Sequence, residues 1–415
     1  MASISLVSTQ THVESPFIIA TIGGYTFGHC ASSKNKEKMG TLLSVVYPNF
    51  MQSLDIVKIN GAVNTYTLKM VYGITQFDDP NLLEKVFSSA SSNRKIVLSY
   101  GDWNAPGYIY KEEEGIITKV SSNVDFKNSQ IVYTVNCTSS CLTLRAGTFD
   151  FSARKAKPSD IIVELLTNSR YGLTNIFKGM KNYKKDTLSK FIAQDDKSVQ
   201  LNAKPSMSVL DYISYLVGCM VCSKETGDAV VGKSTYKWSV YDDINNEYGG
   251  AYFKVQKVTQ GEKHTSADVF EVDVGYPSSN FVTAFTLKDD NTWAILYDYA
   301  DNISMPVQKY KLDDDGELQS VYSPSLTNSS KYFLTTNTSK NWWTQMTQFP
   351  VSATLTIKGL LRPALLMSYV RINTYFYGHK HVSSGLYIIT KQQDSINSSG
   401  YSTTLSLTRV SGDDI

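Results

Sequence analysis

A regular alternation of large apolar residues with smaller or polar ones is the feature that most limits how this chain can fold. Between residues 65 and 74, every second position is aromatic or aliphatic: Tyr66, Leu68, Met70, Tyr72 and Ile74. Successive side chains of a β-strand point to opposite faces, so this period predicts a strand with one buried face. Similar short segments at 95–100, 115–120 and 131–135 predict further strands around it.

The composition agrees with a β-rich protein. The chain has 27 Tyr and 17 Phe residues, which favour strands, and its 42% hydrophobic content is enough for real cores. Its 415 residues are enough for two or three domains at roughly 150 residues each. The 40 basic and 38 acidic residues leave a net charge of +2, so no chain-wide attraction to nucleic acid or to a membrane surface is expected.

Three short amphipathic helices are predicted between the strands. The first covers residues 80–87, with Asp79 as a possible cap and Pro80 at the first helical position. The second opens at Pro158 and has an apolar face at residues 161, 162, 165 and 166. The third starts near Ser208, and its apolar residues recur at 209, 213, 216, 217 and 220, the spacing of one buried stripe.

The C-terminal segment returns to strand patterns. Ala353, Leu355 and Ile357 alternate, and further strands are expected at 369–372 and 375–377. Segments 386–390 and 401–409 predict a final hairpin joined by a long polar turn from Asp394 to Gly400. The chain therefore divides into a β-rich domain at 1–148, an α/β domain at 149–245 and a second β-rich domain at 246–415.

The cysteines do not form a disulfide framework. Cys219 and Cys222 make a C-x2-C pair near the end of a predicted helix, and Cys137 and Cys141 supply two more thiols. Zinc binding and redox chemistry both remain open for these four, but their apolar surroundings favour buried structural thiols. Five cysteines and the lack of a leader peptide favour a reducing cytoplasm as the place of synthesis. No apolar run is long enough for a membrane-spanning helix, so we expect no stable membrane insertion.

Other polar clusters predict no catalytic or metal site. His379 and His381 have a spacing that could hold a metal, but they lie in a solvated context without a third ligand nearby. The carboxylates at 78–79, 112–114 and 313–315 are expected in solvated loops. The dipeptide Gly23-Gly24 lacks the lysine of a phosphate-binding loop, and neither a nucleophile elbow nor an H-E-x-x-H signature is present. We therefore expect no enzyme activity and no cofactor.

The segment from Arg154 to Lys204 is locally basic. From residue 148 to 204 there are 11 basic and six acidic side chains. Its aromatic residues show no base-stacking motif, so a solvated face or a protein contact is favoured over nucleic-acid binding. The five N-x-S/T sequons are interpreted as chance occurrences in a Ser- and Thr-rich chain.

The order of these segments resembles a known family. A β-rich region ending at 126–140 is followed by Pro158-Ser159-Asp160-Ile161-Ile162, and then by Ser208-Val209-Leu210-Asp211-Tyr212. The chain closes with Ser384-Gly385-Leu386-Tyr387-Ile388-Ile389-Thr390 and with the hairpin strand 400–409. This order is similar to that of the baseplate or tail-tip hub proteins of contractile phage tails and related injection systems. That group includes the hub part of the VgrG spike proteins of type VI secretion.

The resemblance implies a fold and a role. The β-rich domains at 1–148 and 246–415 would be two tail-tube-like β-barrels, separated by the helix-containing middle domain. Three copies would form a homotrimer with six barrels around a central channel, which joins the hexameric tail tube protein to a trimeric central spike protein. Tape-measure protein and DNA would pass through the channel. The protein would belong to the virion baseplate, be assembled in the host cytoplasm, and have its spike and any cell-wall enzyme on separate polypeptides.

Two other functions fit parts of the sequence. A carbohydrate-binding protein of a particle surface could use Trp293, Trp342 and Trp343 as stacking platforms, although adjacent strand residues face opposite sides. A cell-wall-degrading enzyme could use carboxylates of the 112–114 or 313–315 cluster as acid and base.

Overall fold

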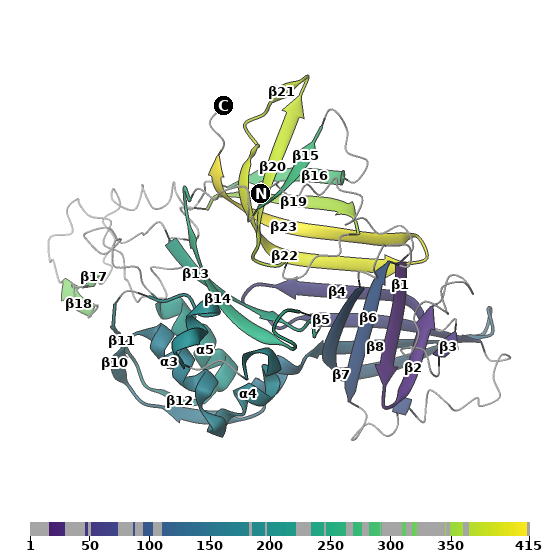
Figure 1. Cartoon of the computed structure of the whole chain (residues 1–415), viewed down its shortest axis with the longest axis horizontal. Coiled ribbons are helices and arrows are strands. Elements are labelled where there is room, and N and C mark those ends of the chain that lie inside the picture. The colour runs from purple at the N-terminus through teal and green to yellow at the C-terminus, as the bar shows by residue number, and fades with distance from the viewer. Residues whose placement is uncertain are drawn as a thin grey trace.

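The chain folds mainly into β-strands, with a helical region on one side (Figure 1). The computed structural model describes most of the chain. The described residues are 16–29, 46–48, 51–73, 86–87, 94–102, 110–181, 185–195, 197–220, 234–244, 246–262, 269–275, 282–290, 292, 309–312, 318–321, 345, 349–359 and 365–412. Among them, fifteen strands join into one sheet, and no helix is long and apolar enough to cross a membrane.

The N-terminal strands form one half of this sheet in the order β4-β5-β8-β7-β6-β1-β2-β3. Their pairings are antiparallel except for the parallel contact of β2 with β3. The strands are β1 (Pro16–Ile22), β2 (Tyr25–His29), β3 (Val46–Pro48), β4 (Met51–Ile59), β5 (Thr65–Gly73), β6 (Lys95–Asp102), β7 (Tyr110–Asp125) and β8 (Gln130–Ser139). Gly23 and Gly24, both at positive φ, form the turn between β1 and β2.

The alternation at 65–74 produces the expected strand. Tyr66, Leu68 and Met70 are buried, and β5 pairs with β8 from Thr65 opposite Thr138 to Gly73 opposite Gln130. The strands expected at 95–100, 115–120 and 131–135 are present as parts of β6, β7 and β8. Val86 and Phe87 are helical, while the rest of the helix expected at 80–87 lies outside the described residues.

The middle of the chain contains the helices. Both expected helices are confirmed: α3 begins at Pro158, and α5 begins after Ser208, whose hydroxyl accepts a hydrogen bond from the backbone N–H of Asp211 at 3.1 Å. The elements are η2 (Ser140–Arg145), β9 (Thr148–Phe151), β10 (Arg154–Ala156), α3 (Pro158–Thr167), η3 (Ser169–Tyr171), α4 (Leu173–Ile176), η4 (Lys178–Met180), η5 (Lys185–Lys190), β11 (Val199–Leu201), β12 (Lys204–Ser208), α5 (Val209–Cys219), β13 (Ser234–Tyr241) and β14 (Tyr252–Thr259).

The C-terminal strands complete the large sheet in the order β16-β19-β23-β22, and β20 joins it through β22. The remaining pair, β17 with β18, forms a separate two-stranded sheet. The strands are β15 (Phe270–Val274), β16 (Val282–Asp289), β17 (Lys309–Leu312), β18 (Leu318–Val321), β19 (Val351–Lys358), β20 (Tyr369–Phe376), β21 (His379–Lys380), β22 (Gly385–Asn397) and β23 (Gly400–Gly412).

Strand β22 connects the two halves of the sheet. Residues 385–388 pair with β20, whereas residues 391–396 pair with β4, and β23 runs along the other edge of both parts. Bulges in the β22–β23 pair, between 386 and 387 and between 389 and 391, fit a strand that bends between two partners. The N-terminal and C-terminal strands therefore form one continuous hydrogen-bonded sheet.

Two expectations differ from the structure. The polar turn from Asp394 to Gly400 is wrong: β22 continues to Asn397, which pairs with Gly400 across a two-residue turn. Asp394 is polar but fully buried, because it bonds with residues inside the sheet. The two closed barrels are not confirmed, since the pairings among the described strands run from β16 to β3 without returning to their start.

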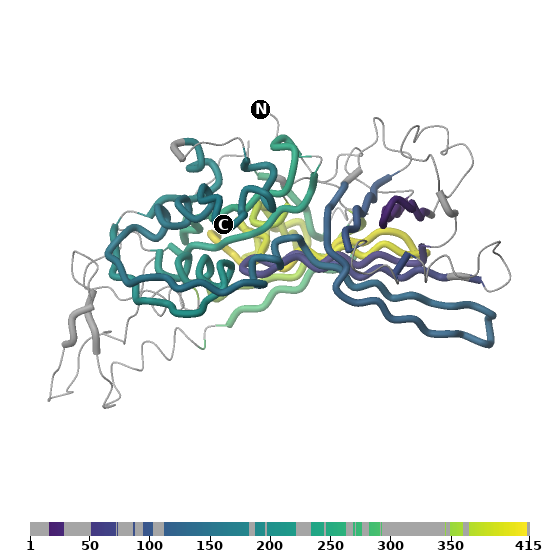
Figure 2. Tube along the Cα trace, turned by 90° about the horizontal axis from the view of Figure 1, so that it is seen from below, coloured from purple at the N-terminus to yellow at the C-terminus, as the bar shows by residue number. Residues whose placement is uncertain are grey.

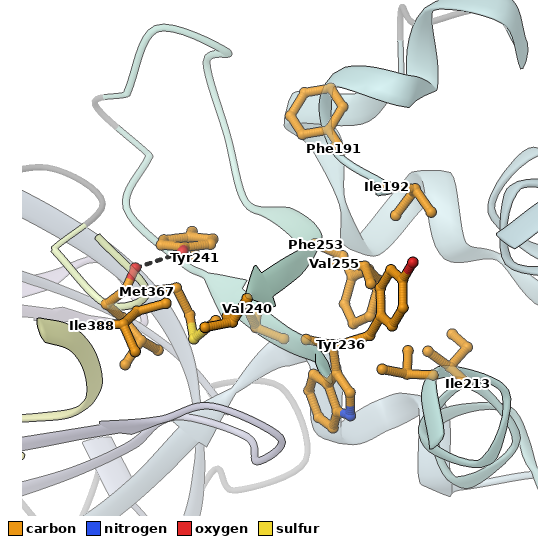
Figure 3. Close-up of a cluster of buried hydrophobic side chains, with 14 of the residues drawn as sticks. Phe191, Ile192, Ile213, Tyr236, Val240, Tyr241, Phe253, Val255, Met367 and Ile388 are labelled. Carbon is orange, nitrogen blue, oxygen red and sulfur yellow. Dashed lines mark hydrogen bonds between the residues drawn. The ribbon is translucent and has the colours of Figure 1, made fainter. Parts of the chain in front are cut away.

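The buried apolar side chains form two clusters. One fills the N-terminal sheet and includes Ile396 and Tyr401 from the C-terminal hairpin. The other unites the helices with the C-terminal strands, and β13 lies at its centre (Figure 3). Val240 lies between Met367 on one side and the helical region on the other, and the Tyr241 hydroxyl donates a hydrogen bond to the Leu366 carbonyl at 2.7 Å.

Replacement of Phe253 by alanine should strongly destabilise this second cluster. The ring is fully buried and stacks on Trp238 at a centroid distance of 5.5 Å. Its loss should lower the free energy of unfolding by about 3–5 kcal/mol, measured by denaturant titration. The matched control Phe376→Ala removes a ring that is mostly exposed and should change the same quantity by less than about 0.5 kcal/mol. Equal effects of the two substitutions would contradict this assignment of the core.

Candidate functional site

A group of buried polar side chains lies where the three parts of the chain meet, and we call it the buried junction. It combines charged, amide and hydroxyl groups from β4 to β8 with residues next to β13 and on β22. Its members are Lys58, Asn64, Tyr66, Tyr100, Glu113, Ser139, Asp242 and Asp394. Buried charges are unfavourable unless they are paired and hydrogen-bonded, so the partners of each group decide what the junction can do.

Lys58 and Glu113 form the ion pair of the junction. Lys58 extends the inward-facing row of β4 after Leu54 and Ile56, and its ammonium contacts the Glu113 carboxylate on β7. Glu113 is 0% exposed and also accepts a hydrogen bond from the Tyr100 hydroxyl at 2.7 Å. Burial by itself would lower the pKa of Lys58, but the Glu113 carboxylate together with the charges of Asp394 and Asp243 outweighs this, so the pKa lies above its ordinary value and the pair stays charged.

Asp242 binds the segment after β13 to the N-terminal sheet. One carboxylate oxygen accepts hydrogen bonds from the Asn64 amide at 2.7 Å and the Tyr66 hydroxyl at 3.0 Å, while the other accepts one from Ser139 at 2.6 Å. Burial nevertheless raises the pKa of Asp242 to about 6, because desolvation of the charged form, helped by the nearby negative charge of Glu113, outweighs these three donors.

Backbone hydrogen bonds support the same contact. The N–H of Ile244 donates to the Glu112 carbonyl at 2.8 Å, and the N–H of Gly61 donates to the Trp238 carbonyl at 2.7 Å. The edge of β7 and the loop between β4 and β5 are therefore both attached to the segment that carries β13. Side-chain and main-chain bonds together hold the middle part of the chain against the N-terminal sheet.

Asp394 brings the C-terminal hairpin into the junction. Its carboxylate accepts hydrogen bonds from Thr403 on β23 at 2.7 Å and from the Gln392 amide at 2.6 Å, and its charge contributes to the raised pKa of Lys58. Residues from all three parts of the chain therefore contribute to one buried electrostatic unit. Such a unit holds structural parts together and fixes their register, and it has no solvent-exposed carboxylate with which to act on a substrate.

The structure corrects the sequence interpretation of the carboxylate clusters. Residues 112–114 lie within β7 and not in a solvated loop, because Glu113 occupies an inward-facing position opposite Lys58. Glu112 and Glu114, on the other face, are half-buried, and Glu112 accepts a hydrogen bond from Ser99 at 3.2 Å. The clusters at 78–79 and 313–315 lie outside the described residues, as do Trp293, Trp342 and Trp343.

The cysteines and histidines fall into two groups. Cys137, Cys141 and Cys219 are buried free thiols, which confirms the packing interpretation for these three, and burial raises the pKa of Cys219 to about 11. Cys222 lies outside the described residues. His379 and His381 are exposed on a hairpin, where His381 Nδ1 lies 2.9 Å from the Ser383 hydroxyl. Within the described part of the chain, no three His, Cys, Asp or Glu side chains gather as a metal site would require.

Several cations of the basic segment contact groups of the middle part of the chain. Arg154 pairs with Glu164 at 3.1 Å, the Arg170 guanidinium lies 5.6 Å from the Phe149 ring, and the Lys204 ammonium lies 4.2 Å from the Tyr215 ring. These contacts within the chain use part of the local positive charge, and the expected solvated or protein-contacting face stays a prediction.

Two hairpins present exposed aromatic rings. Figure 2 shows the β7–β8 hairpin, in blue, running out to one end of the molecule, and Phe126 in its turn is 86% exposed. The β20–β21 hairpin projects at the top of Figure 1 and carries Tyr377, which is 92% exposed. Tyr377 and Gly378 both have positive φ, a conformation that bulky side chains rarely adopt. Both turns are therefore candidate contact surfaces.

Sequence reasoning missed Lys58 and Asp242. The only signal for Lys58 was a charged residue at an inward position of an alternating strand, after Leu54 and Ile56. No local pattern indicates that Asp242 is buried in this site, because its three donors come from residues about 100 or more positions away in the chain.

Removal of one partner from the buried ion pair should destabilise the protein. Glu113→Gln should leave Lys58 without its main counter-charge and lower the free energy of unfolding by about 3–5 kcal/mol. The double variant Lys58→Met with Glu113→Gln should lose much less than the sum of the single variants. The control pair Lys95 and Glu114 is 3.8 Å apart with Lys95 exposed, and its coupling should be about 0–1 kcal/mol. Equal coupling energies in these two double-mutant cycles would refute a structural role for the buried pair.

The raised pKa of Asp242 predicts a pH effect on stability. Between its unfolded pKa near 4 and about 6, the folded state binds more protons, so Asp242 should make the protein less stable as the pH rises through this window. Two pKa units correspond to about 3 kcal/mol. Asp242→Asn should remove this loss, measured as the difference between variant and wild-type unfolding free energies at pH 4 and pH 7. Burial also raises the pKa of Asp195, so the Asp242→Asn variant should keep the part of the pH dependence that comes from Asp195. A constant difference across this range would contradict the prediction.

The fold is similar to those of solved tail proteins, although no protein-family model and no curated protein matches the sequence. The 43 kDa tail protein of prophage MuSo2 from Shewanella oneidensis aligns with a TM-score of 0.50 at 11% identity, over 95% of this chain and 98% of that chain. A tail protein from Neisseria meningitidis aligns at 0.47 with 8% identity, over 95% and 97% of the two chains. A type VI secretion component from E. coli aligns at 0.46 with 9% identity, over 88% and 76%. The chain therefore shares its fold with a prophage tail protein over nearly the whole length of both.

Proposed function

We propose that this chain is a structural protein of the tail of a phage or a phage-derived injection particle, where three copies form the baseplate hub. The observation that carries the proposal is the shared fold with the MuSo2 prophage tail protein, which extends over 95% of this chain and 98% of that one. The sequence resemblance of the 208–212 and 384–409 segments to hub proteins supports the same role independently.

The hub would be a symmetry adaptor. In this proposal the N-terminal strands and the C-terminal strands are two tube-like modules, with the middle domain between them and boundaries near residues 148 and 245. Three chains would then present six modules to a hexameric tail tube protein and a threefold arrangement to a central spike protein. The continuous sheet through β22 supports this proposal, because it holds the two modules in a fixed relation.

Open strand edges support assembly into a ring. Among the described strands, β16 pairs only with β19, and all its residues are exposed except Val282 and Phe285, which are half-buried. An edge of this kind offers unpaired backbone groups that natural proteins cover or pair. Contact with a neighbouring copy or with the tube protein would cover it. Tape-measure protein and DNA would pass through the central channel of the assembled hub.

A structural role also accounts for the carboxylates better than catalysis does. A glycosidase needs two carboxyl groups that reach a sugar, whereas Glu113 is buried and ion-paired with Lys58. The assembled protein would reside in the virion baseplate after assembly in the host cytoplasm.

The proposal predicts a defined assembly. The purified chain, mixed with the tail tube protein and the central spike protein of the same particle, should form a complex containing three copies of its 46.2 kDa chain. Native mass spectrometry gives the copy number, and electron microscopy of particles with this chain labelled gives its position. A chain that stays monomeric with both partners present, or a label away from the tube–spike boundary, would refute the hub assignment.

A further inference from the structure

The turn of the β7–β8 hairpin is held by hydrogen bonds that do not involve its aromatic residue, Phe126. The Asp125 carboxylate accepts hydrogen bonds from the backbone N–H of Lys127 at 3.0 Å and of Asn128 at 3.2 Å, and from the Asn128 amide at 2.7 Å. These bonds, first of all that of the Asn128 side chain, lower the pKa of Asp125 and keep it ionised. Phe126 is left 86% exposed beside the exposed Val124, so an apolar knob stands at the tip between the ionised Asp125 and the exposed Lys127.

A groove with complementary properties lies at the base of the same hairpin. It has a volume of about 640 Å³ and lies between β7 and η2. Phe87, Ile117, Val120 and Leu142 give it an apolar floor, and Lys119 and Arg145 place positive charge at its rim. Ile117 and Val120 pack against the N-terminal core, so the floor is part of the folded sheet. Arg145 also pairs with Asp211 at 3.4 Å, while Lys119 is exposed.

The tip cannot fill the groove of its own chain. From Val120 to Asp125, β7 is paired residue by residue with β8, from Val135 to Gln130. Five steps of extended strand place the tip roughly 17 Å from Val120, and the ladder prevents the hairpin from folding back. A knob from another molecule can enter the groove without this restriction.

We propose that Phe126 of one copy inserts into the groove between β7 and η2 of a second copy, with Asp125 facing Lys119 and Arg145. This inference rests on the proposed function, because it assigns a contact surface to the hub trimer. The contact is heterologous: each copy gives one knob and receives one, so repetition closes a ring if the rotation between copies fits. Phe126 alone covers roughly 150–250 Å², so the exposed flank of the hairpin at 121–123 would supply further interface area.

Three single variants of the full chain test the contact. Phe126→Ala removes the knob, and Thr143→Trp fills the groove from an exposed position on η2 that is compatible with folding. Phe376→Ala is the matched control, because it removes an exposed ring from the other projecting hairpin. Sedimentation velocity over a concentration series should show self-association of the wild type and of Phe376→Ala. The first two variants should need about 30-fold or more higher concentration, as for an interface hot spot. Circular dichroism and thermal unfolding check that each variant folds.

Mixing the two defective variants gives the sharper test. Thr143→Trp keeps an intact knob and Phe126→Ala keeps an intact groove, so together they can form one complete contact. An equimolar mixture should therefore give a species of two chains and nothing larger. In addition, Lys119→Glu should weaken self-association.

The experiments distinguish failure of the proposed contact from failure of the proposed function. If Phe126→Ala assembles like the wild type, or if the mixture stays monomeric, the inference is overturned while the hub assignment stands. If Phe126→Ala loses binding to the tail tube or spike protein and still self-associates, the knob docks on that partner and the second-copy proposal is wrong. A wild type that does not self-associate alone also overturns the inference. One that stays monomeric with tube and spike present overturns the proposed function as well.

Discussion

The pairing of β22 with β4 is the constraint on which the rest of the structure depends. It joins residues near position 55 to residues near position 395 in one antiparallel ladder, from Lys391 opposite Ile59 to Ile396 opposite Leu54. Without it, the N-terminal and C-terminal strands would be separate sheets. Because the hydrogen bonds of an antiparallel ladder are directional and pair specific residues, this contact fixes both the distance and the register between the two halves.

The buried junction adds specificity at the same place. Lys58 lies on β4 and Asp394 on β22, while Glu113 and Asp242 attach β7 and the segment after β13. A buried ion pair contributes little net stability compared with apolar packing, since desolvation offsets most of the attraction. Its value is that a shifted register would leave a buried charge without its partner. The junction therefore favours one arrangement of the three parts, which suits a protein that must present the same surfaces in every copy of an assembly.

The exposed aromatic rings serve a different purpose from the buried junction. Phe126 and Tyr377 are held at the ends of hairpins by local hydrogen bonds and turn geometry, so their rings contribute to surface shape and little to folding. The half of the molecule that contains β7 also contains the groove beneath η2. A rigid interior with rigid projecting turns is the arrangement expected of a scaffold whose contacts lie outside the single chain.

The sequence by itself determined the local structure. Alternation at 65–74 fixed β5, the proline at 158 and the serine at 208 fixed the starts of α3 and α5, and 385–409 fixed the last two strands. These signals are local, because they depend on neighbouring side chains and on backbone geometry. Only the tertiary structure decided that β22 continues to Asn397, that Glu113 is buried, and that Asp242 meets donors about 100 or more positions away. Those outcomes depend on partners from distant segments, and no local pattern records which distant segment will be adjacent.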